Sequence, residues 1–257
     1  MPRAKLVPAA VFAGAAVTAH NVRRVLRLRR VAHVHDHRLD HDTVVGAGEA
    51  QLRVAVLGDS SASGFGLDDP DLAYPYQLAS RLGQLLAASV RVACVAERGA
   101  RLRDVIDQQV PRLAEMDPDL VVMSVGSNDA FGRRLPGHVT ADTRDLLEAV
   151  RVAAPEAQLF LGGPTDLRHA PGLPRPLNVV VGAACRAVAA AQQSVAEEFG
   201  IPFATLPEQL EGDFGPDGFH GGAAAHARAA DITVSALQDA WRGNGLQHGR
   251  SSALSLL

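Results

Sequence analysis

The stretch Val54-Ala-Val-Leu-Gly-Asp-Ser-Ser-Ala-Ser-Gly-Phe-Gly66 decides the fold. Its first four residues, Val54 to Leu57, are small or branched and apolar, which predicts a buried strand. The strand then breaks into Gly58-Asp59-Ser60. Because open α/β sheets bind ligands where their strands end, a hydroxyl at this point predicts a nucleophile at Ser60. The alternative is a turn that uses Gly, Asp and Ser for its geometry alone.

Composition favours one globular domain with extensions. The chain has 257 residues, of which 47% are apolar and 21% charged, enough for a full core. The net charge of the chain is −3. Residues 1–30 carry seven Lys/Arg and no acid, so residues 31–257 carry a net charge of about −10. An acidic body argues against nucleic acid as a partner. Cys94 and Cys185 are expected as free thiols, with a single disulfide as the alternative, and no metal-ligand spacing involves them.

Residues 1–31 combine an apolar run at 6–19 with a following arginine cluster, and three interpretations are open. The favoured one is a membrane anchor or surface helix, since basic residues beside an apolar run bind anionic lipid. A cleaved export signal and a cytosolic arm are the others, because the run is short for a spanning helix. Localisation is therefore undecided between membrane-associated, exported and cytoplasmic.

Two further segments are expected outside the domain proper. Residues 32–51 are rich in His and Asp and are interpreted as a polar linker, with a metal site as the alternative. Residues 243–257 are interpreted as a flexible tail. The domain itself is placed at 52–242.

From residue 52 onward strand-like and helix-like patterns alternate, which predicts βαβ units and a parallel sheet covered by helices on both faces. The fold class is therefore α/β, a three-layer α/β/α sandwich with about five parallel strands. The expected strands are Val54–Leu57, Val90–Ala96, Leu120–Val125, Gln158–Leu161 and Pro202–Leu206. The expected helices are Tyr74–Ala88, Leu102–Glu115, Ala141–Ala153, Val179–Phe199 and Gly222–Trp241.

Polar groups that could serve a serine nucleophile follow other strands of this sheet. Gly99 can offer a backbone N–H to an oxyanion, and Asn128 can offer its side-chain amide. Asp217 and His220 lie three residues apart in a loop, where the carboxylate can orient the imidazole as a base. Each has an ordinary alternative as a turn or cap, and Asp129 is expected in such a structural role. A parallel sheet would gather all of them at one edge.

These residues resemble the sequence blocks of the SGNH (GDSL-type) hydrolase superfamily, including its actinobacterial members. The resemblance spans roughly residues 52–240 and is carried by Gly58-Asp59-Ser60, Gly99, Gly126-x-Asn128-Asp129 and Asp217-x-x-His220. It implies a flavodoxin-like fold with Ser60 as nucleophile, His220 as base and Asp217 as its orienting carboxylate. It also implies an oxyanion hole made by Ser60, Gly99 and Asn128, with no metal and no cofactor. Gly221-Gly222 after the histidine departs from the usual pattern.

The resulting prediction is a serine hydrolase that cleaves small-molecule carboxylic esters of short to medium acyl length through an acyl-enzyme. The loop Phe131–Val139 and the segment Pro164–Leu177 are expected to wall the substrate pocket. One alternative is a lysophospholipase or thioesterase at a membrane surface. Another is a catalytically degenerate domain that binds acyl or glycan ligands. An unrelated nucleotide or receiver module ranks last, because no Gly-x-Gly-x-x-Gly turn follows the first strand.

Overall fold

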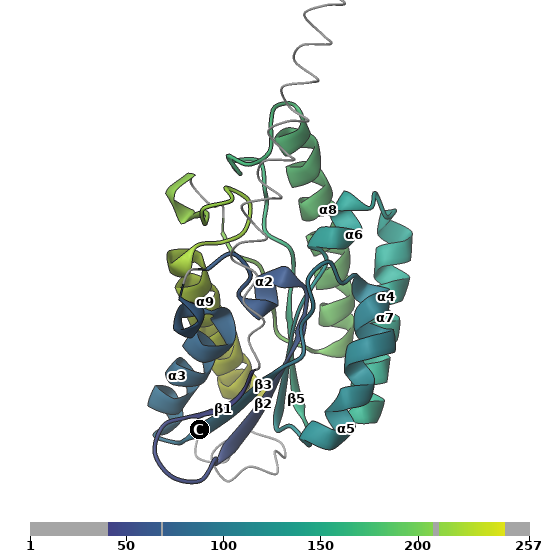
Figure 1. The fold of residues 1–257 in the computed structure, drawn as a ribbon. Helices are drawn as coiled ribbons and strands as arrows, with labels where there is room; N and C mark the ends of the chain where they lie inside the picture. Colours follow the sequence, from purple (N-terminus) through teal and green to yellow (C-terminus); the bar gives the residue numbers. More distant parts are fainter. Residues whose placement is uncertain (1–40, 68, 208–210, 245–257) are drawn as a thin grey trace, which may run out of the picture.

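The computed structural model describes residues 41–67, 69–207 and 211–244. The apolar and basic segment 1–31, residues 32–40 of the expected linker and residues 245–257 of the expected tail lie outside the described residues, and residues 243–244 of that tail end the last helix. Within the described residues, helices cover both faces of one central sheet, as Figure 1 shows. The predicted α/β/α sandwich is therefore confirmed.

The sheet has six strands in the order β1-β3-β2-β4-β5-β6. Five of them are parallel to one another, as expected. Their carboxyl ends share one edge of the sheet, called the carboxyl edge below. The strands are β1 His41–Val45, β2 Leu52–Gly58, β3 Val90–Cys94, β4 Leu120–Ser124, β5 Gln158–Gly162 and β6 Phe203–Ala204.

The sixth strand, β1, is a difference from the sequence analysis, which places residues 41–45 in the polar linker. It pairs antiparallel with β3, with His41 opposite Cys94 and Val45 opposite Val90. An edge strand has one neighbour and tolerates polar residues, so five residues with no long apolar run give little signal. Asp42, part of the predicted His/Asp cluster, forms an ion pair with Arg91 of β3. Within the described residues no cluster of His, Cys, Asp and Glu could hold a metal.

The helices form two layers. Helices α3 and α9 lie on one face of the sheet, while α4, α5, α7 and α8 lie on the other. The short helices α2 and α6 follow β2 and β4 directly and were not predicted. The helices are α2 Ser60–Ser63, α3 Tyr74–Leu86, α4 Leu102–Asp104, α5 Leu113–Met116, α6 Ser127–Phe131, α7 Pro136–Ala153, α8 Leu177–Phe199 and α9 Ala223–Asn244. Three 3-10 turns, Pro70–Leu72, Val110–Arg112 and Glu211–Asp213, complete the set.

The expected helix Leu102–Glu115 is broken into pieces. A π-helical turn at Val105–Gln109 and the 3-10 turn Val110–Arg112 separate α4 from α5. Pro111 lacks an N–H and cannot continue a regular α-helix, which explains why the pattern changes there. The change begins earlier, at the π-helical turn Val105–Gln109, which is not expected within the helix Leu102–Glu115.

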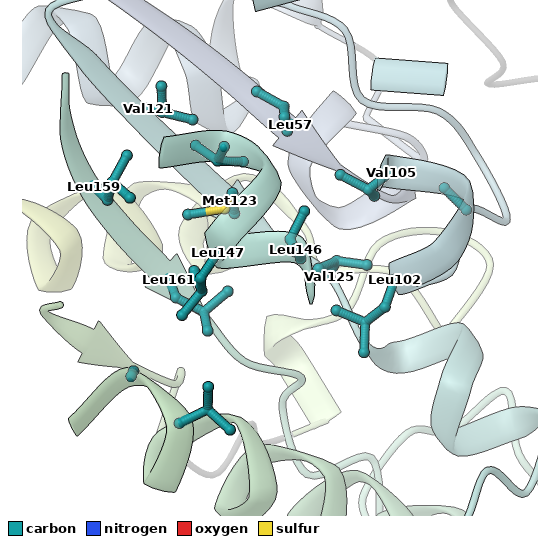
Figure 2. Packing of buried hydrophobic residues seen from close by; sticks show 14 of the residues in the cluster. Leu57, Leu102, Val105, Val121, Met123, Val125, Leu146, Leu147, Leu159 and Leu161 are labelled. Atoms are coloured by element: carbon teal, nitrogen blue, oxygen red, sulfur yellow. The ribbon is translucent and has the colours of Figure 1, made fainter. Parts of the chain in front are cut away.

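The core has two halves, one on each face of the sheet, because successive side chains of a strand point to opposite faces. Ala55 and Leu57 of β2 face α7 and α8, whereas Val54 and Val56 face α3 and α9. Figure 2 shows the first half, where Met123 and Leu161 of the sheet lie beside Leu147 of α7. Because strand side chains alternate between faces, a sheet that is apolar on both faces requires continuous apolar runs such as Val54–Leu57.

The two cysteines belong to opposite halves of the core and are free, as predicted. Cys185 of α8 packs in the half with α7, while the half-buried Cys94 of β3 packs against the half with α3. Helix α8 is long and apolar enough to span a membrane by composition. It nevertheless buries Val181, Cys185 and Val188 in the domain core, which makes it a covering helix of the sandwich.

Candidate active site

The end of β2 is fixed by a glycine and a buried glutamine. Gly58 has φ +144°, and a Cβ there would lie 1.9 Å from the carbonyl oxygen of Ser124. Its N–H donates to Gln109 Oε1 at 2.8 Å, and Gln109 Nε2 donates back to its carbonyl at 2.9 Å. Gln109 comes from the π-helical turn and was missed by sequence reasoning, because it looks like any polar residue within a helix. This pair of bonds sets where the chain leaves the strand.

Ser60 follows at the first position of α2. Asp59 caps that helix, its Oδ1 accepting from the Ser61 N–H at 2.9 Å. The Ser60 side chain is 8% exposed and lines a cavity. Helix and cap therefore hold the hydroxyl at the carboxyl edge, where the sequence predicts it.

Ser60, His220 and Asp217 lie in one hydrogen-bonded line. Ser60 Oγ is 3.0 Å from His220 Nε2, and His220 Nδ1 is 2.6 Å from Asp217 Oδ2. Asp217 is buried, and its Oδ1 accepts from the Phe219 and His220 N–H groups at 2.9 Å each. Burial raises the pKa of Asp217, but the bonds from the His220 ring and backbone outweigh it and hold the pKa below its usual value. The carboxylate therefore stays ionised beside the imidazole.

The loop that carries Asp217 and His220 closes on itself. Gly215 N–H donates to the His220 carbonyl at 2.8 Å, and Gly222 N–H donates to the Asp213 backbone carbonyl at the same distance. A bridge joins Phe214 to Gly221. The Gly221-Gly222 pair, which departs from the family pattern, thus takes part in this closure.

Two aromatic rings frame the imidazole. Phe65 and Phe219 meet His220 edge-on, with ring centroids 4.6 and 4.9 Å away. Gly66 packs against the same side chain, because a Cβ there would lie 3.2 Å from His220 Cβ. The apolar rings restrict rotation of the imidazole and keep its Nε2 directed at Ser60.

The two other predicted donors lie near the same edge. Asn128 of α6 lines the cavity with Ser60, and its amide donates to the Ala100 carbonyl at 3.0 Å and more weakly to Asp59 Oδ2 at 3.5 Å. Gly99 follows β3 with φ +85°, is exposed, and faces open space where a Cβ would be. Gly99 is not among the residues that line the cavity. Asn128 therefore connects the Gly99 loop to the Asp59–Ser60 turn.

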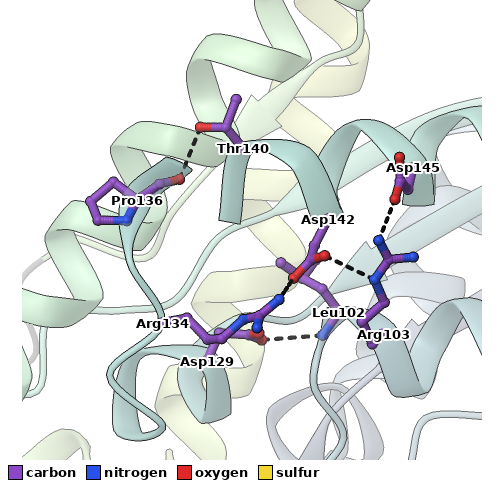
Figure 3. Close-up of polar contacts among 8 residues, drawn as sticks. All are labelled: Leu102, Arg103, Asp129, Arg134, Pro136, Thr140, Asp142 and Asp145. Carbon is purple, nitrogen blue, oxygen red and sulfur yellow. Dashed lines mark hydrogen bonds and ion pairs between the residues drawn. The ribbon is translucent and has the colours of Figure 1, made fainter. Parts of the chain in front are cut away.

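Asp129 has the structural role expected for it. It is buried, and its Oδ2 accepts from the Leu102 N–H at 3.1 Å, which ties α6 to the start of α4 (Figure 3). In the same figure Asp142 of α7 pairs with both Arg103 and Arg134. These contacts hold the segments that carry Gly99 and Asn128 against α7.

The cavity beside Ser60 has a volume of about 110 Å³. The two predicted walls contribute only four residues to its lining, namely Phe131, Pro164, Thr165 and Leu167. Residues 136–139 of the first predicted wall belong instead to α7, where Val139 is fully buried. Apart from the predicted site residues and their neighbours, much of the lining comes from α3, β5, the end of β6 and α9, which sequence reasoning missed. It includes Tyr74, Phe160, Gly163, Thr205, Ala225, His226, Ala229 and Thr233. The small residues among them leave the space that bulkier ones would fill.

His226 is a second histidine in this cavity, and the sequence analysis gives it no role. It is 5% exposed, and burial lowers its pKa to about 4, with a smaller contribution from His220 in the same direction. At neutral pH its ring is therefore uncharged and does not repel a proton held on His220.

Replacing His226 with glutamine is expected to make the protein less sensitive to acid. Because the folded-state pKa is lowered, the unfolded chain takes up the proton first as pH falls, so this group's stabilising contribution is present above about pH 6.5 and is lost towards pH 4. Between pH 7 and pH 5 the wild type should lose about 2 kcal/mol more of its free energy of unfolding than the variant. Urea unfolding at the two pH values measures the difference.

Asp59 changes the free energy of unfolding in the opposite direction over the same pH range, because burial raises the pKa of its carboxyl to about 6. It is present in both proteins, so its contribution cancels in the comparison. An equal loss of stability in wild type and variant would show that His226 is not held neutral by burial.

The sequence of this chain is similar to those of known esterases and acylhydrolases. A model of the GDSL-like lipase/acylhydrolase family matches residues 56–228, which include all five predicted site residues. A GDSL-like esterase of Mycobacterium tuberculosis, Rv1075c, is 25% identical over 201 residues, covering 74% of this chain and 62% of the relative. The chain thus spans less than two thirds of that relative's length.

Solved structures agree on the fold. A family 3 carbohydrate esterase from Clostridium thermocellum superposes with a TM-score of 0.60 at 16% identity, covering 75% of this chain and 98% of the other. An extracellular lipase from Streptomyces rimosus gives 0.57 at 20% identity, with 72% and 99% covered. The family model covers more than half of the chain and contains the Ser60 turn and the His220 loop. This chain belongs to the GDSL-like lipase/acylhydrolase family.

Proposed function

We propose that this protein hydrolyses carboxylic esters through an acyl-enzyme formed on Ser60. The observation that carries the proposal is the continuous line Ser60 Oγ–His220 Nε2–Nδ1–Asp217, with distances of 3.0 and 2.6 Å. A serine hydroxyl needs a base within hydrogen-bond reach, and the base needs an orienting acceptor. Membership of a lipase and acylhydrolase family supports ester chemistry at this site.

In the proposed first half-reaction, Ser60 Oγ attacks the acyl carbonyl while its proton passes to His220 Nε2. The ionised Asp217 stabilises the resulting imidazolium through Nδ1–H. The tetrahedral intermediate then collapses, the bond to the alcohol oxygen breaks, and His220 returns the proton to that oxygen. The alcohol leaves, and the acyl group remains on Ser60.

Water completes the cycle in the second half-reaction. His220 takes a proton from the attacking water, and the new tetrahedral intermediate collapses to release the acid and restore the Ser60 hydroxyl. In both half-reactions the carbonyl oxygen becomes an oxyanion. The Ser60 N–H, the Gly99 N–H and the Asn128 amide are the proposed donors, because preorganised N–H groups stabilise that charge. The Asn128 amide has two hydrogens, and the one that bonds only weakly to Asp59 could serve the oxyanion while the other keeps its bond to the Ala100 carbonyl.

The size of the cavity favours short acyl groups. Sites for drug-sized ligands usually exceed about 300 Å³, whereas this cavity has about 110 Å³. Its lining includes the buried residues Tyr74, Phe160 and Thr233, and a 2.8 Å hydrogen bond between the Tyr74 and Thr233 hydroxyls joins α3 to α9. A long acyl chain would not fit in this cavity, and part of it would have to lie on the protein surface.

The purified protein is therefore expected to turn over p-nitrophenyl acetate and butyrate with a kcat/KM at least about tenfold above that for the palmitate ester, since each misfit methylene costs on the order of 1 kcal/mol. Initial rates across the ester series, at concentrations below micelle formation, measure this profile. Widening the cavity with Thr233→Ala is expected to shift the optimum towards longer chains. A maximum at palmitate in the wild type would contradict the assignment of this cavity to the acyl group.

A lysophospholipase or thioesterase acting at a membrane surface is the second candidate. It keeps the acyl-enzyme chemistry and changes the substrate to a lysophospholipid ester or to a thioester, whose leaving group is a thiol. The exposed apolar and basic surface around the site favours a substrate presented by a membrane. Association with a membrane through residues 1–31 belongs to this proposal.

A further inference from the structure

Large exposed apolar side chains gather around the site. Eight are exposed among the described residues, and six of them lie at or just beyond the carboxyl edge. The two elsewhere are Val44 on β1 and Val152 at the far end of α7. The six are Leu72, Phe131, Leu135, Leu177, Val179 and Val180, exposed by between 37% and 65%.

Five of these six come from two short segments, 131–138 and 175–180, which together are called the rim. The segments read Phe-Gly-Arg-Arg-Leu-Pro-Gly-His and Arg-Pro-Leu-Asn-Val-Val and contain no acid. Arg133 and Arg175 are exposed. Figure 1 shows the first turns of α8, which carry Val179 and Val180, projecting beyond the neighbouring helices. The rim thus combines exposed apolar side chains with positive charge, although the body of the protein is acidic.

Exposed carboxylates at the carboxyl edge occur outside the rim. Asp69 and Asp71 precede α3, and Glu97 follows β3. The named acids therefore lie beside β2 and β3, where Arg98 and Arg101 are exposed as well, whereas the rim beside β4 and β5 has no acid.

The chain also enters the domain at this edge. Because β1 is antiparallel, its first residue, His41, lies opposite Cys94 at the carboxyl end of β3. Residues 1–30, with seven Lys/Arg and an apolar run, precede it in the sequence. The nine residues 32–40 can span at most about 30 Å. Any membrane contact made by residues 1–31 would therefore hold the carboxyl edge, and not the opposite one, close to the lipid.

We propose that the rim docks on the surface of an anionic phospholipid membrane. Its apolar side chains would enter the boundary between headgroups and acyl chains, and Arg133 and Arg175 would meet lipid phosphates. Phe131 belongs both to the rim and to the cavity lining. If the proposed function holds, the docked site opens towards the lipid and takes its ester from there.

The test uses the full chain with single cysteines introduced in the rim, at Val180→Cys or Leu135→Cys. The control is Val152→Cys, which is 83% exposed at the other end of α7. Each variant is labelled with an environment-sensitive nitrobenzoxadiazole dye, and the unmodified chain gives the background from Cys94. Vesicles of phosphatidylglycerol with phosphatidylcholine are compared with phosphatidylcholine alone.

With anionic vesicles, the dye at positions 180 and 135 is expected to shift to the blue, while the dye at 152 stays as in buffer. Arg133→Gln combined with Arg175→Gln should weaken vesicle binding by about tenfold or more, since each basic residue contributes about 1 kcal/mol at an anionic surface. Arg112→Gln combined with Arg242→Gln, on the 3-10 turn before α5 and near the end of α9, is the charge-matched control and should leave binding unchanged.

A blue shift at 152, no shift at 180 and 135, or equal shifts with neutral vesicles would overturn the proposal. Turnover of p-nitrophenyl acetate without vesicles is measured on the same variants. Retained turnover with no shift rejects the docking surface alone, whereas lost turnover in the wild type rejects the proposed function.

Discussion

Replacing Ser60 with alanine is expected to lower kcat for p-nitrophenyl acetate by about ten-thousandfold or more. The variant loses the only atom that the proposed mechanism acylates, and removing one member of a triad costs nearly as much as removing all three. The fold should be retained, because Asp59 still caps α2 through the Ser61 N–H. Steady-state kinetics and a thermal unfolding curve measure the two effects separately.

Ser61→Ala is the matched control, since Ser61 lies one position further along the same helix and also lines the cavity. Its rate should change by less than about tenfold, because its backbone N–H, which makes the bond to Asp59, is kept. Activity that survives Ser60→Ala would mean that the hydrolysis occurs elsewhere or by another mechanism.

Replacing Asp217 with asparagine is expected to lower kcat by about a thousandfold to ten-thousandfold. The carboxylate accepts from His220 Nδ1 at 2.6 Å and from two backbone N–H groups. An amide that keeps the two backbone bonds directs its NH₂ at Nδ1, which stabilises the tautomer whose Nε2 carries the proton. That tautomer cannot accept the proton of Ser60.

The pH profile gives this prediction a second measurement. The pKa of Asp217 lies below its usual value, so this carboxylate should stay ionised above about pH 4. Its protonation should therefore not lower the wild-type rate in that range. Asp213→Asn serves as the control, because Asp213 pairs with Arg228 at the base of the same loop, whereas Asp217 bonds to the His220 ring. Equal losses in the Asp213 and Asp217 variants would indicate that loop stability, and not imidazole orientation, determines the rate.

The sequence predicts most of the sheet because its strands are buried on both faces. Val54–Leu57 and Leu120–Val125 are continuous apolar runs, and a buried parallel strand needs such a run. Strand β1 gives no such signal, since one of its edges is unpaired and Asp42 is stabilised by an arginine on its neighbour. The short helices α2 and α6 are also missed, because four or five residues are too few to show a helical period.

The line of Ser60, His220 and Asp217 is predictable because the order of the parallel strands forces their loops to one edge. The cavity is not predictable in this way, because the residues that line it lie far apart in the sequence. Their small side chains leave an open space only because α9 packs over β5. Gln109 and His226 are similar cases. Each looks like a polar residue within a helix until the structure shows that Gln109 bonds to Gly58 and that His226 is buried beside His220.

The measurement that tests the central claim most directly is mass analysis of the folded protein after reaction with a fluorophosphonate. The account predicts one adduct, located on the peptide that contains Ser60, formed by the wild type and absent from Ser60→Ala. It also predicts a much slower reaction for His220→Ala, whose base at 3.0 Å from Ser60 Oγ has been removed. No adduct in the folded wild type, or an adduct on another residue, would contradict the assignment of Ser60 as the nucleophile.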